Sequence, residues 1–177
     1  MRKATDYSET DPELSSVLQE HEKTLRLPSF SAEIAWEIGS LLRKRFVEEK
    51  APLGLSAAIQ IRAFPEGSSK NPLVLFATTV GDVMPGISSL VAGKANVVSW
   101  TGRSTYLSRI DFKKHGIDLA EFGLPSPEYF MHGGAFPVRL VNHEAPVAVI
   151  IVSGMPSMAD DHQIIVDTVE AYLASLK

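Results

Sequence analysis

The chain has 177 residues, which is within the usual length of a single domain. Its contents of 45% hydrophobic and 21% charged residues exclude a disordered chain and an integral membrane protein. The net charge of -4 comes without a stripe of lysines and arginines, so we expect no nucleic-acid partner.

The residue types also bear on the cellular compartment. No cysteine is present, which excludes disulfides, thiolate catalysis and cysteine-ligated metal centres and fits the reducing cytosol. The first residues lack the apolar core of a signal peptide, and the longest strongly apolar run, residues 147–152, is too short to cross a bilayer. We therefore expect a cytoplasmic protein without a membrane partner.

Two helices are predicted in the first part of the chain. One opens at residues 11–13, carries apolar side chains at helical spacing and ends before Pro28. Ser31 is typical of a helix N-cap, so the second helix is expected over residues 32–50. The apolar side of this second helix is predicted to comprise Ile34, Ile38, Leu41, Leu42 and Phe46.

A β-hairpin and a further helix follow. Residues 55–62 alternate between apolar and polar side chains, which predicts a half-buried strand. A turn-forming stretch, residues 65–72, leads to a returning strand over residues 73–80, and its polar composition predicts a long, mobile tip. From Ile87 onward the spacing of apolar residues predicts a helix, with Lys94 in the middle of its apolar face.

The last third of the chain predicts a second hairpin. Residues 111–127 are expected to form an irregular connection with a short helical turn over 119–122. The strands of the hairpin are predicted at residues 136–141 and 146–152, joined by the turn-prone residues between them.

A closing helix is predicted from about Ser157. Its inward residues are expected to be Ile164, Ile165, Val169, Tyr172, Leu173 and Leu176. These elements predict an α/β (α+β) fold in which helices flank a sheet with antiparallel hairpins. We find no internal repeat or linker, and we expect a helical extension over residues 1–28 and one domain over residues 29–177.

The second hairpin also predicts a candidate site. If its strands pair across the turn, Gly134 lies roughly opposite Ser153, and both strand ends share one open end of the sheet with the start of the last helix. Free N–H groups at the start of that helix would add to the site. The residues that converge there are predicted to be His132, Gly133, Gly134, Ser153, Gly154, Asp160, Asp161 and His162.

Each of these residues also has a purely structural interpretation. The glycines at 133–134 suit a bulge or a positive φ as well as the close approach of a ligand. The aspartates at 160–161 suit the helix dipole as well as acid or base chemistry. His132 and His162 suit ordinary hydrogen bonds as well as a metal or haem contact. The Lys94 side chain is compatible with three roles: extension to the surface, contact with an anionic ligand, or pairing with a buried carboxylate.

Several enzyme classes are excluded by motif. Ser153 is not in a Gly-x-Ser-x-Gly frame, and no P-loop, His-Glu-x-x-His or dinucleotide-binding fingerprint occurs. A complete set of nucleophile, base and orienting group cannot be written from these residues, so the sequence leaves open whether the protein is an enzyme.

Four segments resemble the haem-degrading-domain superfamily, which includes the HbpS-like and GlcG-like proteins, and most closely its cytosolic branch, for which no reaction is established. The similarity extends over about residues 30–177. The segments are 94–98 (KANVV) with Trp100 and 104–105 (ST), 132–138 (HGGAFPV), 152–156 (VSGMP) and 161–162 (DH). The resemblance implies a profilin-like fold, with a central antiparallel sheet between helices, and assembly into homo-oligomers.

Two functions are compatible with this resemblance. The first is a small-ligand protein that binds haem or a related tetrapyrrole, with His132 or His162 as the axial or metal ligand and Lys94 or Arg103 at the propionates. The second is a non-enzymatic oligomeric scaffold that binds other proteins, for example in chaperone-linked complexes.

Overall fold

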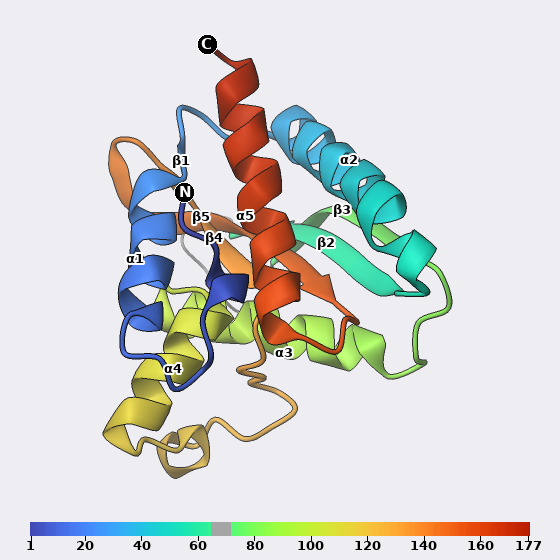
Figure 1. Cartoon of the computed structure of the whole chain (residues 1–177). Helices are drawn as coiled ribbons and strands as arrows, with labels where there is room; N and C mark the ends of the chain where they lie inside the picture. Colours follow the sequence, from blue (N-terminus) through green and yellow to red (C-terminus); the bar gives the residue numbers. More distant parts are fainter. Residues whose placement is uncertain (65–71) are drawn as a thin grey trace.

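A computed structural model describes residues 1–64 and 72–177, and a five-stranded sheet forms its centre (Figure 1). The strand order is β1-β4-β5-β2-β3. The strands β1 and β4 are parallel, and all other neighbouring strands are antiparallel. The two predicted hairpins are the antiparallel pairs β2–β3 and β4–β5. The strands are β1 (Arg26–Leu27), β2 (Ala57–Ala63), β3 (Leu73–Val80), β4 (Ala135–Leu140) and β5 (His143–Ser153).

Helices cover both faces of the sheet (Figure 1). They are α1 (Leu14–Thr24), α2 (Ala32–Glu49), α3 (Ile87–Thr101), α4 (Thr105–His115) and α5 (Met158–Ser175). Helices α2 and α5 share the larger apolar core with one face, while α3 packs on the other. None of the helices in the two described ranges combines the length and apolarity needed to cross a bilayer. The expected α/β fold with flanking helices and a long C-terminal helix is confirmed.

The central strand β5 shows how the sheet separates two apolar layers. Its side chains alternate, so Ile150 and Val152 belong to the core under α2 and α5, whereas Val149 and Ile151 belong to the core under α3. A strand that is buried on both faces has no polar alternation. The continuous apolar run in this part of the sequence therefore follows from its central place in the sheet.

The buried side of α2 differs from the predicted one. Ala35, Ile38 and Gly39 are buried there together with Leu42 and Phe46. Leu41, which was predicted to face inward, is instead 42% exposed, and Ile34 is only partly buried. The reason is Gly39: a Cβ atom at this position would lie 2.4 Å from Cγ of Phe76, so the helix turns its glycine toward that ring.

The connection after α3 contains a helix that the sequence analysis did not predict. The expectation of irregular chain from residue 111 is wrong up to His115, because α4 begins at Thr105 and ends there. The Ser104 hydroxyl caps this helix by accepting the Leu107 N–H. The predicted short helical turn is confirmed as a 3-10 turn, Leu119–Phe122.

Both hairpins form, but the second is tighter than predicted. Leu140 pairs with His143, so the connection is two residues long, and the register shifts between Val138 and Leu140. Ala135 pairs with Ile151, which places Gly134 opposite Val152, one residue away from the predicted partner. The predicted mobile tip of the first hairpin lies almost wholly outside the described residues.

The first 28 residues pack on the rest of the chain. Leu14 and Leu18 of α1 belong to a core cluster with Tyr106 of α4. Glu22 lies at the same junction, where its carboxylate accepts the Ser104 N–H at 2.7 Å and pairs with Arg139 at 3.1 Å. In Figure 1 this N-terminal segment lies along the same side of the molecule as α4.

Candidate functional site

A buried ion pair lies where the last helix begins. Lys94, in the middle of α3, is 1% exposed, and Asp161, in the first turn of α5, is 3% exposed. The Lys94 Nζ is 3.2 Å from Asp161 Oδ2 and donates a hydrogen bond of 3.0 Å to the Val152 carbonyl. Lys94 therefore does not extend to the surface; of its three predicted interpretations, the structure shows the buried carboxylate.

The two charges of this pair are held in a nearly dry environment. Burial raises the pKa of Asp161 to about 6, and the Lys94 ammonium and the N–H groups of Met155 and Gly154 oppose that rise. Burial also lowers the pKa of Lys94. The second carboxylate oxygen, Asp161 Oδ1, accepts the Met155 N–H at 3.3 Å. Each charged atom thus has a partner, as buried charges require.

The predicted glycine pair allows strand β4 to enter beside this ion pair. Gly134 has a φ of 108°, which favours glycine. A side chain at this position would clash with its surroundings, because a Cβ atom would lie 2.3 Å from the Val152 carbonyl oxygen and 2.7 Å from Asp161 Cβ. At Gly133 a Cβ atom would lie 2.5 Å from the Met158 carbonyl oxygen. The segment before β4 therefore lies directly against the first turn of α5.

Two other predicted residues lie at the same end of the sheet as this ion pair. Ser153 is buried and pairs with Ala58 of β2, and Gly154 lies against Ser56 and Ala57. The structure thus brings both strand ends and the start of α5 together.

His162 lies inside the molecule. It is fully buried and stacks on His21 of α1, with ring centroids 5.4 Å apart. Its Nε2 is 3.2 Å from Nδ1 of His21, and Nε2 of His21 is 2.8 Å from the Arg2 carbonyl oxygen. The Nδ1 atom of His162 has no hydrogen-bond partner among the described residues. Burial lowers the pKa of His162 to about 3 and also lowers that of His21, so both rings are neutral at pH 7.

His132 lies at the surface, in contrast to His162. Its ring stacks on Phe130 with centroids 4.2 Å apart and an interplanar angle of 11°. Partial burial lowers its pKa, and the nearby cations Arg109 and Lys94 act in the same direction, while Glu9 opposes them. Within residues 1–64 and 72–177, no group of three or more histidine, aspartate or glutamate side chains is arranged to hold a metal ion.

Arg103 lies on the surface at the start of α4. Its guanidinium is 2.6 Å from an oxygen of Asp111, so it forms a local ion pair within that region of the chain.

An open pocket of about 370 Å³ adjoins the start of α5. It is lined by Thr5, Tyr7, Glu9, Tyr106, Pro156, Ser157, Met158, Ala159 and Asp160. We call it the α5 pocket. Its Met158 is the residue against which Gly133 packs, so the segment before β4, which carries His132, meets the start of α5 next to this pocket. His132 itself is not among the lining residues.

The α5 pocket combines three chemical features. The N–H groups at the start of a helix lack intrahelical acceptors and carry partial positive charge. Tyr106, which is 2% exposed, and Tyr7 place two phenol side chains in the wall. The Glu9 carboxylate is 3.4 Å from Arg109 and 3.6 Å from Lys113, so two cations surround the acidic group of this wall.

One wall of this pocket was not predicted from the sequence. Thr5, Tyr7 and Glu9 come from the N-terminal segment, and Tyr106 comes from the unpredicted helix α4. The spacing of Tyr106, Leu107 and Ile110 after a serine N-cap was the available signal for that helix.

The ion pair generates a stability prediction. We expect Asp161→Asn to lower the free energy of unfolding by about 3–5 kcal/mol, because the Lys94 ammonium stays buried without a counter-charge. The double variant Lys94→Met, Asp161→Asn should regain at least half of that loss, since both charges are gone. Urea unfolding measures both values. As a control, Arg103→Met breaks an exposed pair and should cost no more than about 1 kcal/mol. A double variant that is no more stable than Asp161→Asn alone would contradict this account of the pair.

The buried histidines generate a pH prediction. The folded-state pKa of His162, about 3, lies below its ordinary value of 6.5, so its contribution to stability is complete above that value and is lost as the pH falls. Between pH 7 and pH 5 this single group should remove about 2 kcal/mol of unfolding free energy. His162→Phe should flatten the pH dependence by that amount, whereas His143→Phe, at the exposed start of β5, should not. An unchanged slope in His162→Phe would contradict this.

Comparisons with known proteins agree with the resemblance seen in the sequence. The family model described as haem degrading protein HbpS-like matches residues 30–170. A UPF0303 protein of Zymomonas mobilis is 32% identical over 164 residues, which cover 92% of this chain and 81% of that relative.

Solved structures share the fold. The crystal structure of the Ybr137w protein superposes with a TM-score of 0.78 at 24% identity and covers 92% of this chain and 90% of its own. A structure described as a PduOC:heme complex has a TM-score of 0.56 at 16% identity and covers 75% of this chain and 91% of its own. The chain therefore belongs to the HbpS-like family of the haem-degrading-domain superfamily, as its sequence motifs predicted.

Proposed function

We propose that this protein binds haem or a related tetrapyrrole at the α5 pocket, with the imidazole of His132 as the axial ligand. The observation that carries the proposal is an exposed histidine, stacked on Phe130, whose neighbour Gly133 packs on Met158 in the wall of a pocket that also contains two tyrosines. Its volume of about 370 Å³ is within the range of small-molecule sites, roughly 300–1,000 Å³.

The residues present fit the chemistry of this ligand. An axial histidine must offer an unprotonated nitrogen, and the lowered pKa of His132 favours that form near neutral pH. Propionate groups need cations, and Arg109, which is paired with Glu9 of the pocket wall at 3.4 Å, would exchange that carboxylate for a propionate. Tyr7, which is half-buried in the pocket wall, offers aromatic surface on which a macrocycle would pack.

The other predicted residues have supporting roles in this proposal. Gly133, Gly134, Ser153 and Gly154 shape the backbone at the pocket wall, and the buried pair of Lys94 and Asp161 holds that wall in place. His162 stays within the core and Arg103 stays paired at the surface, so neither contacts the ligand. Haem, when bound, supplies the iron to which a substrate or a second ligand can attach.

Two of the comparisons support this assignment. The matching family is described as haem-degrading, and one structure with the same fold is described as a heme complex. Both descriptions concern other proteins, and the geometry around His132 is what connects them with this chain.

Haem titration tests the proposal. We expect the purified protein to shift the Soret band of added haemin and His132→Ala to weaken binding at least tenfold, because the axial bond is lost. Arg109→Met should weaken binding less, since only a propionate contact is removed.

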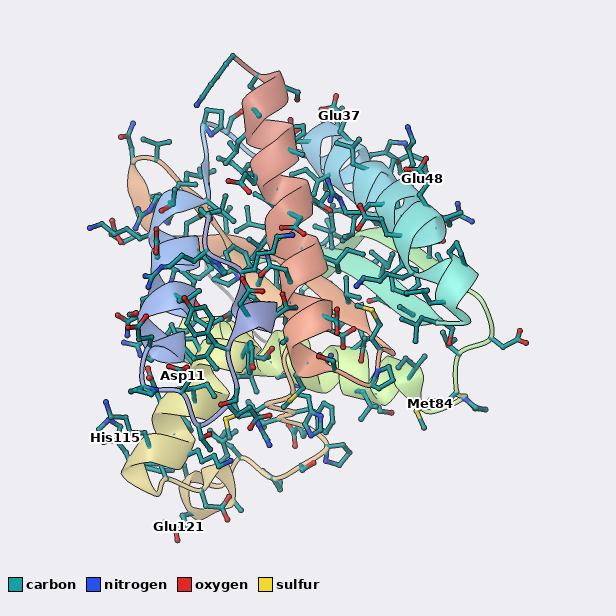
Figure 2. All side chains as sticks on the ribbon, viewed as in Figure 1. Asp11, Glu37, Glu48, Met84, His115 and Glu121 are labelled. Atoms are coloured by element: carbon teal, nitrogen blue, oxygen red, sulfur yellow. The ribbon has the colours of Figure 1, made fainter. Side chains whose placement is uncertain are left out.

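His115→Ala and His143→Ala are matched controls, because both histidines are exposed and lie elsewhere; His115 is labelled in Figure 2 at the far end of α4. Both should bind haemin as the unchanged protein does. Full retention of affinity and spectrum in His132→Ala would contradict the proposal.

We also propose that the protein acts in the cytosol as a homo-oligomer. An aromatic cluster at the ends of α3 and α4 supports this: Trp100 is 48% exposed and Phe122 is 58% exposed, and Trp100 packs edge-on against Phe112. Exposed aromatic clusters are typical of protein interfaces. Light scattering should give a multiple of the chain mass and a smaller mass for Trp100→Glu, Phe122→Glu. An unchanged mass in this variant would place the contact elsewhere.

A further inference from the structure

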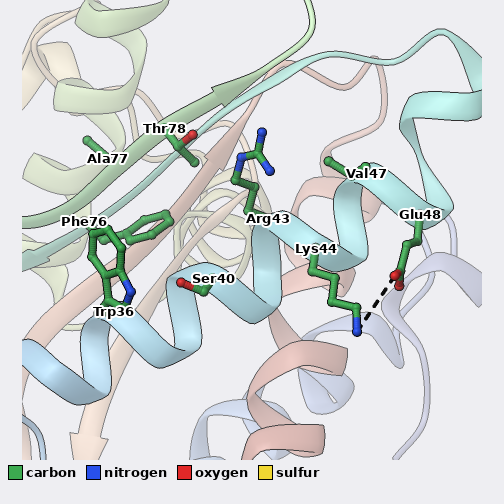
Figure 3. A pocket seen from close by; sticks show the side chains of 9 residues that line it. All are labelled: Trp36, Ser40, Arg43, Lys44, Val47, Glu48, Phe76, Ala77 and Thr78. Carbon is green, nitrogen blue, oxygen red and sulfur yellow. Dashed lines mark ion pairs between the residues drawn. The ribbon is translucent and has the colours of Figure 1, made fainter.

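A second cavity lies between helix α2 and strand β3, away from the α5 pocket (Figure 3). Its volume is about 420 Å³. It is lined by Trp36, Ser40, Arg43, Lys44, Val47, Glu48, Phe76, Ala77 and Thr78. We call it the α2–β3 groove.

Small residues create this groove. Gly39 lets the ring of Phe76 lie directly against α2, and Ser40 and Ala77 leave the space beside that ring open. Trp36 packs edge-on against Phe76, with centroids 5.5 Å apart, yet 63% of its surface remains exposed. The groove therefore has a fixed aromatic floor and an apolar side that faces solvent.

The groove runs along an open edge of the sheet. Strand β3 is the last strand in the order, and within the described residues it pairs only with β2. Side chains alternate along a strand, so Ala77 points away from the face that carries Phe76 and Thr78, yet all three line the groove. The groove thus reaches around to the edge, where the backbone N–H and C=O groups of β3 have no partner strand from residues 1–64 and 72–177.

The charges along the groove favour an acidic occupant. Lys44 is 3.9 Å from Glu48 of the next turn, whereas Arg43 has no ion-pair partner among the described residues. Figure 3 shows the Arg43 side chain rising from α2 on the side where Thr78 lies, so its guanidinium stands over the space beside the strand.

We propose that the α2–β3 groove binds an extended peptide segment of another protein, which adds to β3 as a further strand. Alternate side chains of the peptide would pack on Trp36 and Val47, and an acidic residue would pair with Arg43. A twofold-related second copy fits less well, because an axis through the middle of the groove brings Arg43 and Lys44 of both copies together. This inference is independent of haem binding.

Selection from a displayed library of random ten-residue peptides tests the proposal. The purified protein is the target, and an excess of the Trp36→Ala, Arg43→Glu variant in solution removes peptides that bind elsewhere. Enriched peptides should alternate apolar residues and contain aspartate or glutamate. The best synthetic peptide should bind Arg43→Glu at least tenfold more weakly than the unchanged protein.

Two controls separate this contact from general electrostatics. Lys114→Glu removes an exposed cation on α4 and should leave peptide binding unchanged. A peptide with lysine in place of its acidic residue should prefer Arg43→Glu. His132→Ala should bind the peptide normally, so failure of one proposal does not affect the other.

Hydrogen exchange should slow at alternate amides of β3 when the peptide is bound, because only those N–H groups face the new strand.

Four outcomes would overturn the inference. Three of them are an absence of enriched peptides, enrichment of basic peptides, and binding without protection of β3. A fourth is a fall in the mass of the protein in Trp36→Ala, Arg43→Glu, which would show that a second copy occupies the groove.

Discussion

The contact between Lys94 and Asp161 connects the two layers of the molecule. Lys94 belongs to α3, on one face of the sheet, and Asp161 belongs to α5, on the other face. Their charges meet at the end of the sheet, beside the Val152 carbonyl, in a space that exists because Gly134 has no side chain. Burial makes an unpaired charge costly, so each partner fixes the position of the other.

The position of the α5 pocket follows from this constraint. Asp161 fixes the first turn of α5, and residues 156–160, in this turn and just before it, form one wall of the pocket. Gly133 rests on Met158 of the same turn, which sets where the chain leaves the strand and therefore where His132 reaches the surface. The histidine and the pocket are thus placed by one buried interaction.

Much of the fold could be predicted because it depends on local patterns. Alternation predicted the first strand of the first hairpin, and turn-prone residues predicted the second hairpin. Ser31 was predicted as the cap of α2 and Ser157 as the approximate start of α5, and each hydroxyl accepts a backbone N–H there. The meeting of both strand ends with α5 followed from strand pairing. The faces of α2 were assigned less well, because Gly39 is buried by its contact with Phe76, which lies far away in the sequence.

The site was less predictable, because its decisive features are tertiary. Sequence spacing cannot distinguish His132, at the surface, from His162, which is enclosed by His21, Tyr106 and Phe136. Tyr7 and Glu9 reach the pocket only because α1 and α4 pack together. Lys94 was recognised as unusual on an apolar helix face, but only the fold shows that its partner is Asp161.

The position of the iron in a crystal of the haem-bound protein is the most direct test of the central claim. Anomalous scattering at the iron absorption edge locates that atom without reference to the rest of the ligand. We predict one iron site per chain, bonded to the imidazole of His132 at the mouth of the α5 pocket. An iron bonded to another histidine, or a haem in the α2–β3 groove, would contradict it.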